Sequence, residues 1–461
     1  MLYQKNLPVR ENCDLLVVGG GPAGVACAIA AARRGLNCLL LEREGCLGGT
    51  ASASGVMQLL GGRRYDAASD AMVREVGGIF DEITDRLIAE GSAVDPDTVD
   101  VHHYNPYGWY PRMAAGVACD IERLKLHLDR ALREAGAHVR MYTQVIDLAK
   151  PVDERVSQAI VYDRSGMYAI QAEMFADCTG DAELANLAGC PCEKGRLEDS
   201  AMCPSTLIFY VDHVDTKRYV TYQNQHQSPK WVEIVRRLRE EGIWRFPFDI
   251  FIAIQTAQEG VFMVNTVRQI DVDGTDSQSL TDATMDGREL SYELLDVMQK
   301  YFPGFEHARM RRVFDRMGVR ETRRIVARKV IALEDALNGV HYEDCVASST
   351  YNFDLPDPKR PSFDPMMGDV KQPNATRKHI HIEIPYRALL PQKIDNMIIA
   401  GRSLGAQREV MGACRVMGPC MGMGQAAGVA ASLAPGGRFP DVPVVELQKL
   451  LREAGCLGVR A

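Results

Sequence analysis

The chain has 461 residues, with 53 lysines and arginines against 61 aspartates and glutamates, which gives a formal net charge of −8. This acidic balance argues against a nucleic-acid partner, because binding to phosphates needs a concentrated basic face. Hydrophobic residues make up 46% of the chain and charged residues 25%, which excludes a largely disordered protein. The length predicts about two or three packed domains.

Two uncharged stretches, 15–32 and 416–437, are long enough to imitate membrane spans. The first contains three glycines and Pro22 in its middle, and the second contains Gly418, Pro419 and Gln425. Loop-forming residues within a span would leave backbone polar groups unpaired in lipid. We therefore expect no membrane span. The 13 cysteines are scattered among apolar neighbours, which is typical of reduced core thiols and favours a cytoplasmic protein over a disulfide-linked one.

The stretch from residue 14 to residue 42 predicts a strand, a helix and a second strand in close succession. Residues 14–18 form a short apolar run of the kind found in buried parallel strands. Pro22 falls in the first turn of an alanine-rich helix at 23–34, where its missing N–H costs nothing. Residues 37–42 then form the second strand, and this order is typical of a dinucleotide-binding fold.

Three glycines join the first strand to the helix with the spacing GxGxxG. Gly19 permits the tight turn, Gly21 lets the backbone approach a diphosphate, and Gly24 lets the helix pack closely on the strand. Glu42 ends the second strand, where its carboxylate can accept hydrogen bonds from a ribose. The alternative is a glycine-rich turn that binds no nucleotide, and the placement of strand, helix and carboxylate argues against it.

A second glycine pair, Gly48 and Gly49 followed by Thr50, indicates which dinucleotide binds. An NAD-type domain would normally continue into a helix at this point, whereas bare backbone here can face the longer cofactor FAD. The alternative is a plain loop. Because no second GxGxxG with an acidic partner follows, we do not expect a built-in pyridine-nucleotide domain.

The rest of the chain predicts an α/β protein with an insertion. An amphipathic helix is expected at 120–136, a strand at 137–145 and a hairpin at 158–177. Alternating extended and helical runs then indicate an antiparallel sheet with helices on one face. The predicted organisation is a Rossmann-like FAD-binding domain with a β-meander in two parts, 1–200 and 391–461, with an α+β substrate or cap domain at 201–390 between them.

The strings VVGGGPAGVACAIAAARRG and LLLEREGCLGGTASASG resemble the opening of the FAD-dependent oxidoreductase family with the glutathione-reductase-type flavin fold. The later segments FADCTGDAELANLAG, RETRRI and IPYRALLPQKIDNMIIAGRSLGA fit its branch akin to fumarate reductase and succinate dehydrogenase flavoproteins. The resemblance implies that Val145 contacts the adenine through its backbone. It also implies that the cofactor is bordered by Thr179, Gly180, Asp181, Gly401 and Arg402.

The glycine-rich run 418–424 precedes an expected helix at 424–433. A helix N-terminus offers free N–H groups and a positive dipole end, and the resemblance implies that it points at the flavin ring. The alternative is close packing by small residues, and both can hold. The expected cofactor-binding residues are Gly19, Gly21, Pro22, Ala23, Gly24, Glu42, Arg43, Gly48, Gly49, Thr50, Val145, Thr179, Gly180, Asp181, Gly401, Arg402, Gly424 and Gln425.

Hydride transfer also needs groups that hold the substrate and move a proton. Polar residues just before and within the C-terminal flavin segment are the candidates, and each has an alternative structural role as an ion-pair partner or surface residue. A loop with two histidines and several aromatics is a weaker candidate for capping the substrate. The expected catalytic residues are His381, Tyr386, Arg387 and Arg415, with His379 also weighed, and the weaker substrate contacts are His102, His103, Arg408 and Glu409.

The leading hypothesis is an FAD-dependent oxidoreductase that transfers a hydride between flavin N5 and a small polar, carboxylate-bearing metabolite. We expect non-covalent FAD, because no histidine lies near residues 48–55, where fumarate reductases attach it. No metal is expected, an external electron donor or acceptor is required, and a homo-oligomer is left open. The alternatives are an NAD-binding or thiazole-synthase-like non-redox enzyme, and an electron-transfer subunit of a larger complex.

Overall fold

The computed structural model describes residues 4–108, 116–227, 231–356, 358 and 381–459. Its largest sheet has seven strands, and the strands nearest the predicted dinucleotide loop are parallel. Two antiparallel strands extend the sheet as a meander. The order is β7 (His138–Arg140), β2 (Cys38–Leu41), β1 (Val9–Val18), β10 (Gly166–Asp177), β9 (Gln158–Asp163) and β8 (Gln144–Leu148), with β21 (Met397–Ile399) also paired to β10.

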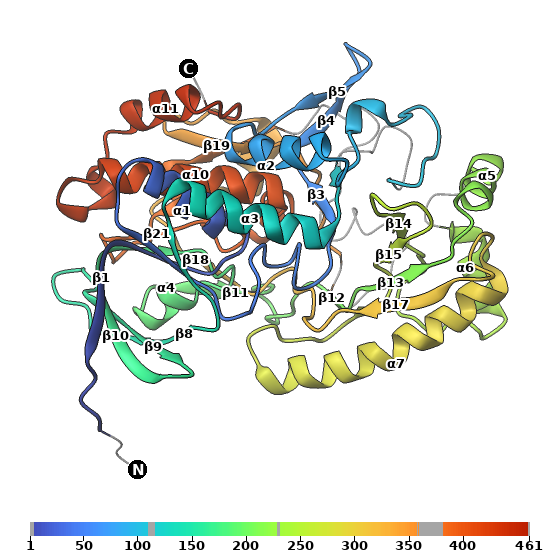
Figure 1. Ribbon diagram of the computed structural model, residues 1–461, viewed down its shortest axis with the longest axis horizontal. Helices are drawn as coiled ribbons and strands as arrows, with labels where there is room; N and C mark the ends of the chain where they lie inside the picture. Colours follow the sequence, from blue (N-terminus) through green and yellow to red (C-terminus); the bar gives the residue numbers. More distant parts are fainter. Residues whose placement is uncertain (1–3, 109–115, 228–230, 357, 359–380, 460–461) are drawn as a thin grey trace.

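Helices cover this sheet because their small and apolar faces are buried against it. In Figure 1, α1 lies between α10 and α3 beside the sheet, and α4 lies on the other side, near β8 and β10. Asp120 accepts N–H bonds from the first turn of α3, and Gly136 ends that helix in the left-handed conformation. The helices are α1 (Pro22–Arg33), α2 (Gly78–Ala89), α3 (Ile121–Ala135), α4 (Glu183–Leu187), α10 (Met417–Leu433) and α11 (Val444–Glu453).

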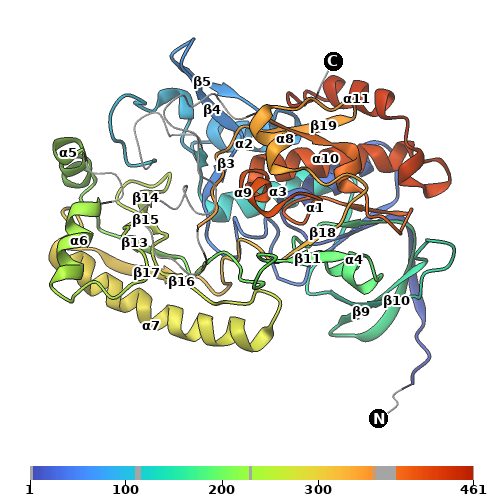
Figure 2. The ribbon, with the colours of Figure 1, turned by 180° about the vertical axis from the view of Figure 1, so that it is seen from behind.

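A second sheet of four antiparallel strands forms a separate lobe, on the right of Figure 1 and on the left of Figure 2. Its core is rich in aromatic rings, including Trp231, Trp244, Phe251 and Phe302, and one long helix packs against it. The strand order is β14 (Ala253–Gln255), β15 (Phe262–Val264), β13 (Phe209–Asp212) and β17 (Arg309–Val313), with α5 (Thr216–His226), α6 (Val232–Glu240) and α7 (Ser277–Tyr301).

Within the described residues, the other strands form separate two-stranded sheets. The 3₁₀ turns are Pro96–Thr98, Tyr386–Leu389, Pro435–Gly437 and Phe439–Asp441. The strand pairs are β3 (Gln58–Leu60) with β6 (Gly116–Ala118), β4 (Arg63–Asp66) with β5 (Ala71–Arg74), β11 (Cys192–Lys194) with β18 (Arg323–Ile325), β12 (Ser205–Thr206) with β16 (Arg268–Gln269), and β19 (Cys345–Ser349) with β20 (Ile382–Pro385). Two further helices are α8 (Leu333–Asn338) and α9 (Arg408–Cys414).

The mixed α/β fold with a parallel sheet is as predicted, and two local features differ. The expected strand at 137–145 is two strands, β7 and β8, because Tyr142 turns the chain at a φ of +56°. Residues of α8, β19 and β20 share a core with α1 and α10 instead of packing on the four-stranded sheet. We therefore propose that the inserted unit ends nearer residue 320 than the expected residue 390.

Candidate functional site

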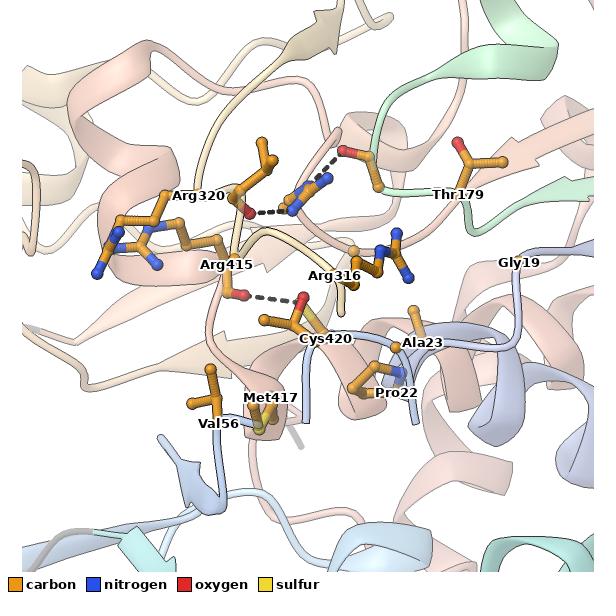
Figure 3. Close-up of a pocket in the computed structure, with 18 of the residues that line it drawn as sticks. Gly19, Pro22, Ala23, Val56, Thr179, Arg316, Arg320, Arg415, Met417 and Cys420 are labelled. Carbon is orange, nitrogen blue, oxygen red and sulfur yellow. Dashed lines mark hydrogen bonds between the residues drawn. The ribbon is translucent and has the colours of Figure 1, made fainter. Parts of the chain in front are cut away.

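One pocket extends from the carboxyl ends of β1 and β2 to the four-stranded sheet of the second lobe. Figure 3 shows Gly19, Pro22 and Ala23 on one side of this pocket and Arg320 and Arg415 on the other. In open α/β sheets, ligands bind beyond the carboxyl ends of the strands, which is where this pocket begins. We call the part at Gly19 the dinucleotide end and the part at Arg320 the arginine end.

The glycines of the loop between β1 and α1 do three different things. Gly19 has a φ of +101°, which a side chain would strain. A Cβ on Gly24 would lie 1.8 Å from the carbonyl oxygen of Gly19. The helix α1 can therefore pack this closely on the loop only because residue 24 is glycine. A Cβ on Gly21 would meet nothing within 4 Å, and Gly21 lines the pocket. Gly21 therefore presents bare backbone to a ligand, as a dinucleotide requires.

Glu42 and the second glycine pair hold this loop in place. The Glu42 carboxylate accepts N–H bonds from Gly20 at 2.7 Å and from Glu44 at 2.8 Å, and the residue also lines the pocket. Gly48 donates its N–H to the Gly20 carbonyl at 2.8 Å. A Cβ on Gly49 would lie 2.9 Å from the Cα of Gly21, so the two glycine loops are in close contact. Arg43, Thr50 and Val145 line the same end.

Arg402 joins the segment after β10 to the segment after β21. Its Nη2 is 2.5 Å from the Asp181 carboxylate, and its Nε donates to the Gly180 carbonyl at 2.7 Å. Thr322 also donates to Asp181, at 2.7 Å. Burial opposes the charged form of Asp181, but Arg402 and Thr322 outweigh it and lower the pKa. Thr179, Gly180, Gly401 and Arg402 line the pocket. Asp181 does not line it, but its carboxylate holds Arg402 in position.

Replacing Asp181 with asparagine should lower the free energy of unfolding by about 1.5–3 kcal/mol at pH 7, since a charge-assisted bond to Arg402 becomes a neutral one. Arg402 keeps the pKa of Asp181 below its unfolded value, so the carboxylate stabilises the fold above about pH 4. Urea unfolding should show a constant difference between pH 5 and pH 8 that shrinks only as acid protonates Asp181.

The exposed Asp441, which pairs with Arg438 at 2.8 Å, is the matched control. Replacing it with asparagine should change the free energy of unfolding by less than about 1 kcal/mol, as is usual for surface ion pairs. An equal loss in both variants, or no loss in D181N, would contradict the role given to the buried pair.

The helix expected at 424–433 begins earlier, at Met417, so Gly424 and Gln425 are in its interior. Proline is tolerated in the first turn, which explains why Pro419 does not delay the start of the helix. A Cβ on Gly424 would lie 2.0 Å from the Ala23 carbonyl oxygen, and Gln425 accepts the N–H of Ile79. Both residues therefore pack helices together, and Val416 and Met417 instead bring this helix end to the pocket.

Three arginines from different segments meet at the arginine end. Arg268 begins β16, Arg320 follows the strand β17, and Arg415 follows α9. Arg320 donates to the Pro204 carbonyl and the Thr206 hydroxyl, both at 2.7 Å, and to the Asn265 side chain at 3.2 Å.

Asp354 supplies a carboxylate to this cluster of three arginines. It accepts from Nη2 of Arg415 at 3.1 Å. Arg268 is only 5% exposed, and its Nε and Nη1 have no hydrogen-bond partner among the described residues. The Nε of Arg415 is also buried without a partner there.

The electrostatics of this end favour an anionic ligand. Burial, followed by the charges of Arg268 and Arg415, lowers the pKa of Arg320 to about 9. Burial also lowers the pKa of Arg268. Because guanidinium groups stay charged near neutral pH, these shifts indicate that Asp354 only partly offsets the positive charge of the three arginines. A bound anion would offset the rest of that charge.

Several of the expected catalytic residues lie outside the pocket. Tyr386 is buried, and its hydroxyl donates to the Phe439 carbonyl at 2.9 Å, so it serves packing. Arg387 pairs with Asp344 at 2.8 Å and is largely exposed. His381 is exposed and precedes β20. We therefore withdraw these three as catalytic residues and retain Arg415. His379 lies outside the described residues.

The weaker substrate candidates are also elsewhere. Arg408 is buried and pairs with Glu321 at 2.8 Å, within a network that links α9 to β18. Glu409 is half-buried in α9 and does not line the pocket. His102 and His103 are exposed and lie near Asp70 and Asp100. Because their side chains point to solvent or into ion pairs, we withdraw them as substrate contacts.

Sequence reasoning missed Arg268, Arg316 and Arg320, which all line the pocket. Arg320 is the first residue of the RETRRI string, which was assigned no role. Arg268 and Arg316 stand in no recognisable local pattern, since only the packing of the second lobe brings them to the pocket. The RETRRI string could have indicated Arg320, whereas no sequence feature indicated Arg268 or Arg316.

Among the described residues, no helix is long and apolar enough to cross a membrane. In the same part of the chain, no group of three or more histidine, cysteine, aspartate or glutamate side chains is placed to hold a metal ion.

The parallel sheet, the glycine loop and the pocket beyond it define a dinucleotide-binding oxidoreductase fold. The chain matches the model of the FAD dependent oxidoreductase family over residues 14–451, and it belongs to this family. The protein is therefore an enzyme that uses FAD. The residues described above fit the cofactor, because Gly21 leaves open space in the pocket and Glu42 lies at the end of β2.

The chain is similar to 4-oxocyclohex-2-ene-1-carboxylate 5-dehydrogenase of Sinomonas cyclohexanicum, with 38% identity over 96 residues, 20% of this chain and 16% of that protein. It is also similar to the probable electron transfer flavoprotein-quinone oxidoreductase of Escherichia coli, with 43% identity over 60 residues, 13% of this chain and 12% of that protein. The matches thus span less than a fifth of these relatives.

Among solved structures, a geranylgeranyl bacteriochlorophyll reductase-like protein from Thermoplasma acidophilum aligns over 96% of this chain and 84% of its own, with 14% identity and a TM-score of 0.46. The p-nitrophenol 4-monooxygenase of Pseudomonas putida aligns over 96% and 81%, with 12% identity and a TM-score of 0.45.

Proposed function

We propose that this enzyme transfers a hydride between flavin N5 and a small polar metabolite that carries a carboxylate. The observation that carries the proposal is the arginine end of the pocket, where Arg268, Arg320 and Arg415 line the same cavity as the dinucleotide loop. Guanidinium groups bind carboxylates with paired, charge-assisted hydrogen bonds. FAD, when bound, supplies the hydride acceptor or donor.

The balance of charge at this end supports a carboxylate over a neutral substrate. Arg268 is buried, and two of its nitrogens are unpartnered within the described chain. A buried positive charge favours an anionic ligand, which offsets that charge, over a neutral ligand, which does not. Arg320 is held in place by Pro204, Thr206 and Asn265, which prepares it to meet a ligand without reorganisation.

The side chains at the arginine end suggest how a substrate would be held. Arg268 lines the pocket and would place its positive charge beside the carboxylate, while Asp354 keeps Arg415 oriented. Tyr351 lines the pocket beside them, and burial, followed by Asp354, raises the pKa of its phenol. Tyr351 therefore remains protonated and can donate a hydrogen bond. In this arrangement the carboxylate anchors the substrate, and the pocket leads from there to the dinucleotide end.

We also propose which residues hold FAD. These are the expected cofactor residues that line the pocket; Gly24, Gly48, Asp181, Gly424 and Gln425 support them through packing or hydrogen bonds. The lining residues are Gly19, Gly21, Pro22, Ala23, Glu42, Arg43, Gly49, Thr50, Val145, Thr179, Gly180, Gly401 and Arg402. Non-covalent attachment, an external electron donor or acceptor and a cytoplasmic location remain predictions. One named relative acts on a cyclic carboxylate, which is consistent with the proposed substrate class.

Anaerobic mixing of the FAD-loaded enzyme with candidate substrates tests this function. Each carboxylic acid is paired with its amide, so that the two ligands differ mainly in charge. We expect one class of acids to bleach the flavin absorption near 450 nm, or to reoxidise the reduced flavin, at least about 100-fold more efficiently than its amide. Equal activity with acid and amide would overturn the carboxylate assignment. Reduction by a protein partner alone would favour an electron-transfer subunit.

A further inference from the structure

We propose that Arg316, which comes from the second lobe, binds a phosphate of the FAD dinucleotide. Arg316 follows β17, a strand of the four-stranded sheet, and it lines the same pocket as Gly19 and Gly21. Figure 3 shows its guanidinium on the side of the pocket that holds Pro22, Ala23 and Thr179, apart from Arg320 and Arg415. It therefore faces the dinucleotide end.

The charges around Arg316 show what it lacks. Its electrostatic neighbours are Glu42, Arg43, Asp181 and Arg402. Arg43 pairs with Glu183 at 3.2 Å, and Arg402 pairs with Asp181 at 2.5 Å. Arg316 forms no hydrogen bond or ion pair of its own with the other described residues, so Glu42 and Asp181 offset its positive charge only at a distance.

Glu42 favours the charge of Arg316 through space but does not pair with it directly. Its two carboxylate oxygens already accept the N–H groups of Gly20 and Glu44. Burial, followed by the charge of Arg43, lowers the pKa of Arg316, which means that the free pocket disfavours this cation. The phosphates are the charged part of FAD, and a guanidinium is well suited to bind them. A phosphate would form the direct ion pair with Arg316 that no group among the described residues forms.

The inference changes the role of the second lobe. In the sequence-based prediction, that unit served the substrate alone. With Arg316 bound to the dinucleotide, the cofactor instead contacts both lobes and links them. The inference uses only the FAD cofactor and is independent of the substrate proposed above.

The test compares the FAD affinity of the wild-type protein with that of Arg316→Gln, Arg316→Met and Arg316→Lys. Flavin is removed, and binding of FAD, ADP and riboflavin is followed by fluorescence and calorimetry. Both neutral variants should bind FAD and ADP about 10- to 100-fold more weakly, as expected for the loss of a charge-assisted hydrogen bond. Riboflavin, which has no phosphate, should bind unchanged, and the lysine variant should be intermediate.

Arg311→Gln is the matched control, because Arg311 lies on β17, the strand that precedes Arg316, is exposed and contacts Gln258. It should bind all three ligands like the wild type. The inference is overturned if both neutral variants, with wild-type circular dichroism, keep wild-type affinity for FAD and ADP. It is also overturned if only riboflavin binding weakens, which would place Arg316 against the ring. The two neutral variants differ in shape and hydrogen bonding, so a folding defect in one leaves the other to decide.

Discussion

Replacing Arg268 with methionine should lower kcat/KM for the substrate by at least about 30-fold while leaving FAD content and thermal stability intact. The substrate loss follows because Arg268 lines the arginine end of the pocket and brings a buried positive charge to it. Stability should hold or rise because a buried cation that forms no hydrogen bond through Nε or Nη1 is costly, and methionine fills a similar volume. The melting temperature, the flavin spectrum and steady-state kinetics are the measurements.

Arg309 supplies the control for this experiment, since it is exposed on β17. Arg309→Gln should be kinetically silent. If Arg268→Met instead unfolds several degrees earlier and loses FAD, Arg268 stabilises the fold and does not serve the substrate. Its contact with the ring of Phe248, at 5.5 Å, would then be the interaction to examine.

Two alanine substitutions in the glycine loop should fail in different ways. Gly24→Ala places a Cβ 1.8 Å from the Gly19 carbonyl oxygen, so α1 must move away and the free energy of unfolding should fall by about 3 kcal/mol or more. Gly21→Ala meets no protein atom within 4 Å, and its φ of −71° suits alanine. This variant should fold normally and bind FAD at least about tenfold more weakly, because the Cβ enters the ligand's space.

The measurements are urea unfolding of the flavin-free proteins and FAD titration of those that fold. Gly422→Ala is the control. Gly422 lies within α10, and its Cβ would be 3.5 Å from Val76, which is an ordinary van der Waals distance. It should keep both stability and FAD. Wild-type FAD affinity in Gly21→Ala would show that the dinucleotide does not lie against this loop.

The dinucleotide end was largely predictable because its chemistry is local in the sequence. The strand, the GxGxxG spacing and Glu42 all lie within residues 14–42, and steric rules relate each glycine to its role. The same locality misplaced the start of α10, where the residues 418–424 suggested a loop. Low helix propensity was outweighed there by close packing on α1, which only small residues allow.

The arginine end was not predictable in the same way. Arg415 lies in the C-terminal flavin segment and was among the residues expected from the sequence. Arg268 and Arg320 were not expected, because they come from β16 and from the segment after β17. Long-range packing of the second lobe places them in the pocket. Tyr386 shows the converse error, because a polar residue near the flavin segment in sequence donates to Phe439 in the core. Sequence proximity to a cofactor motif does not establish which way a side chain points.

The central claim is that one pocket joins a dinucleotide to a carboxylate bound by arginines. The most direct test titrates FAD-loaded protein with the most efficient acid from the anaerobic screen, under conditions without turnover, and records the flavin absorption spectrum. We predict a saturable spectral change in the wild type and in Arg309→Gln that is at least about 30-fold weaker in affinity in Arg268→Met. The same affinity in all three proteins would contradict the account.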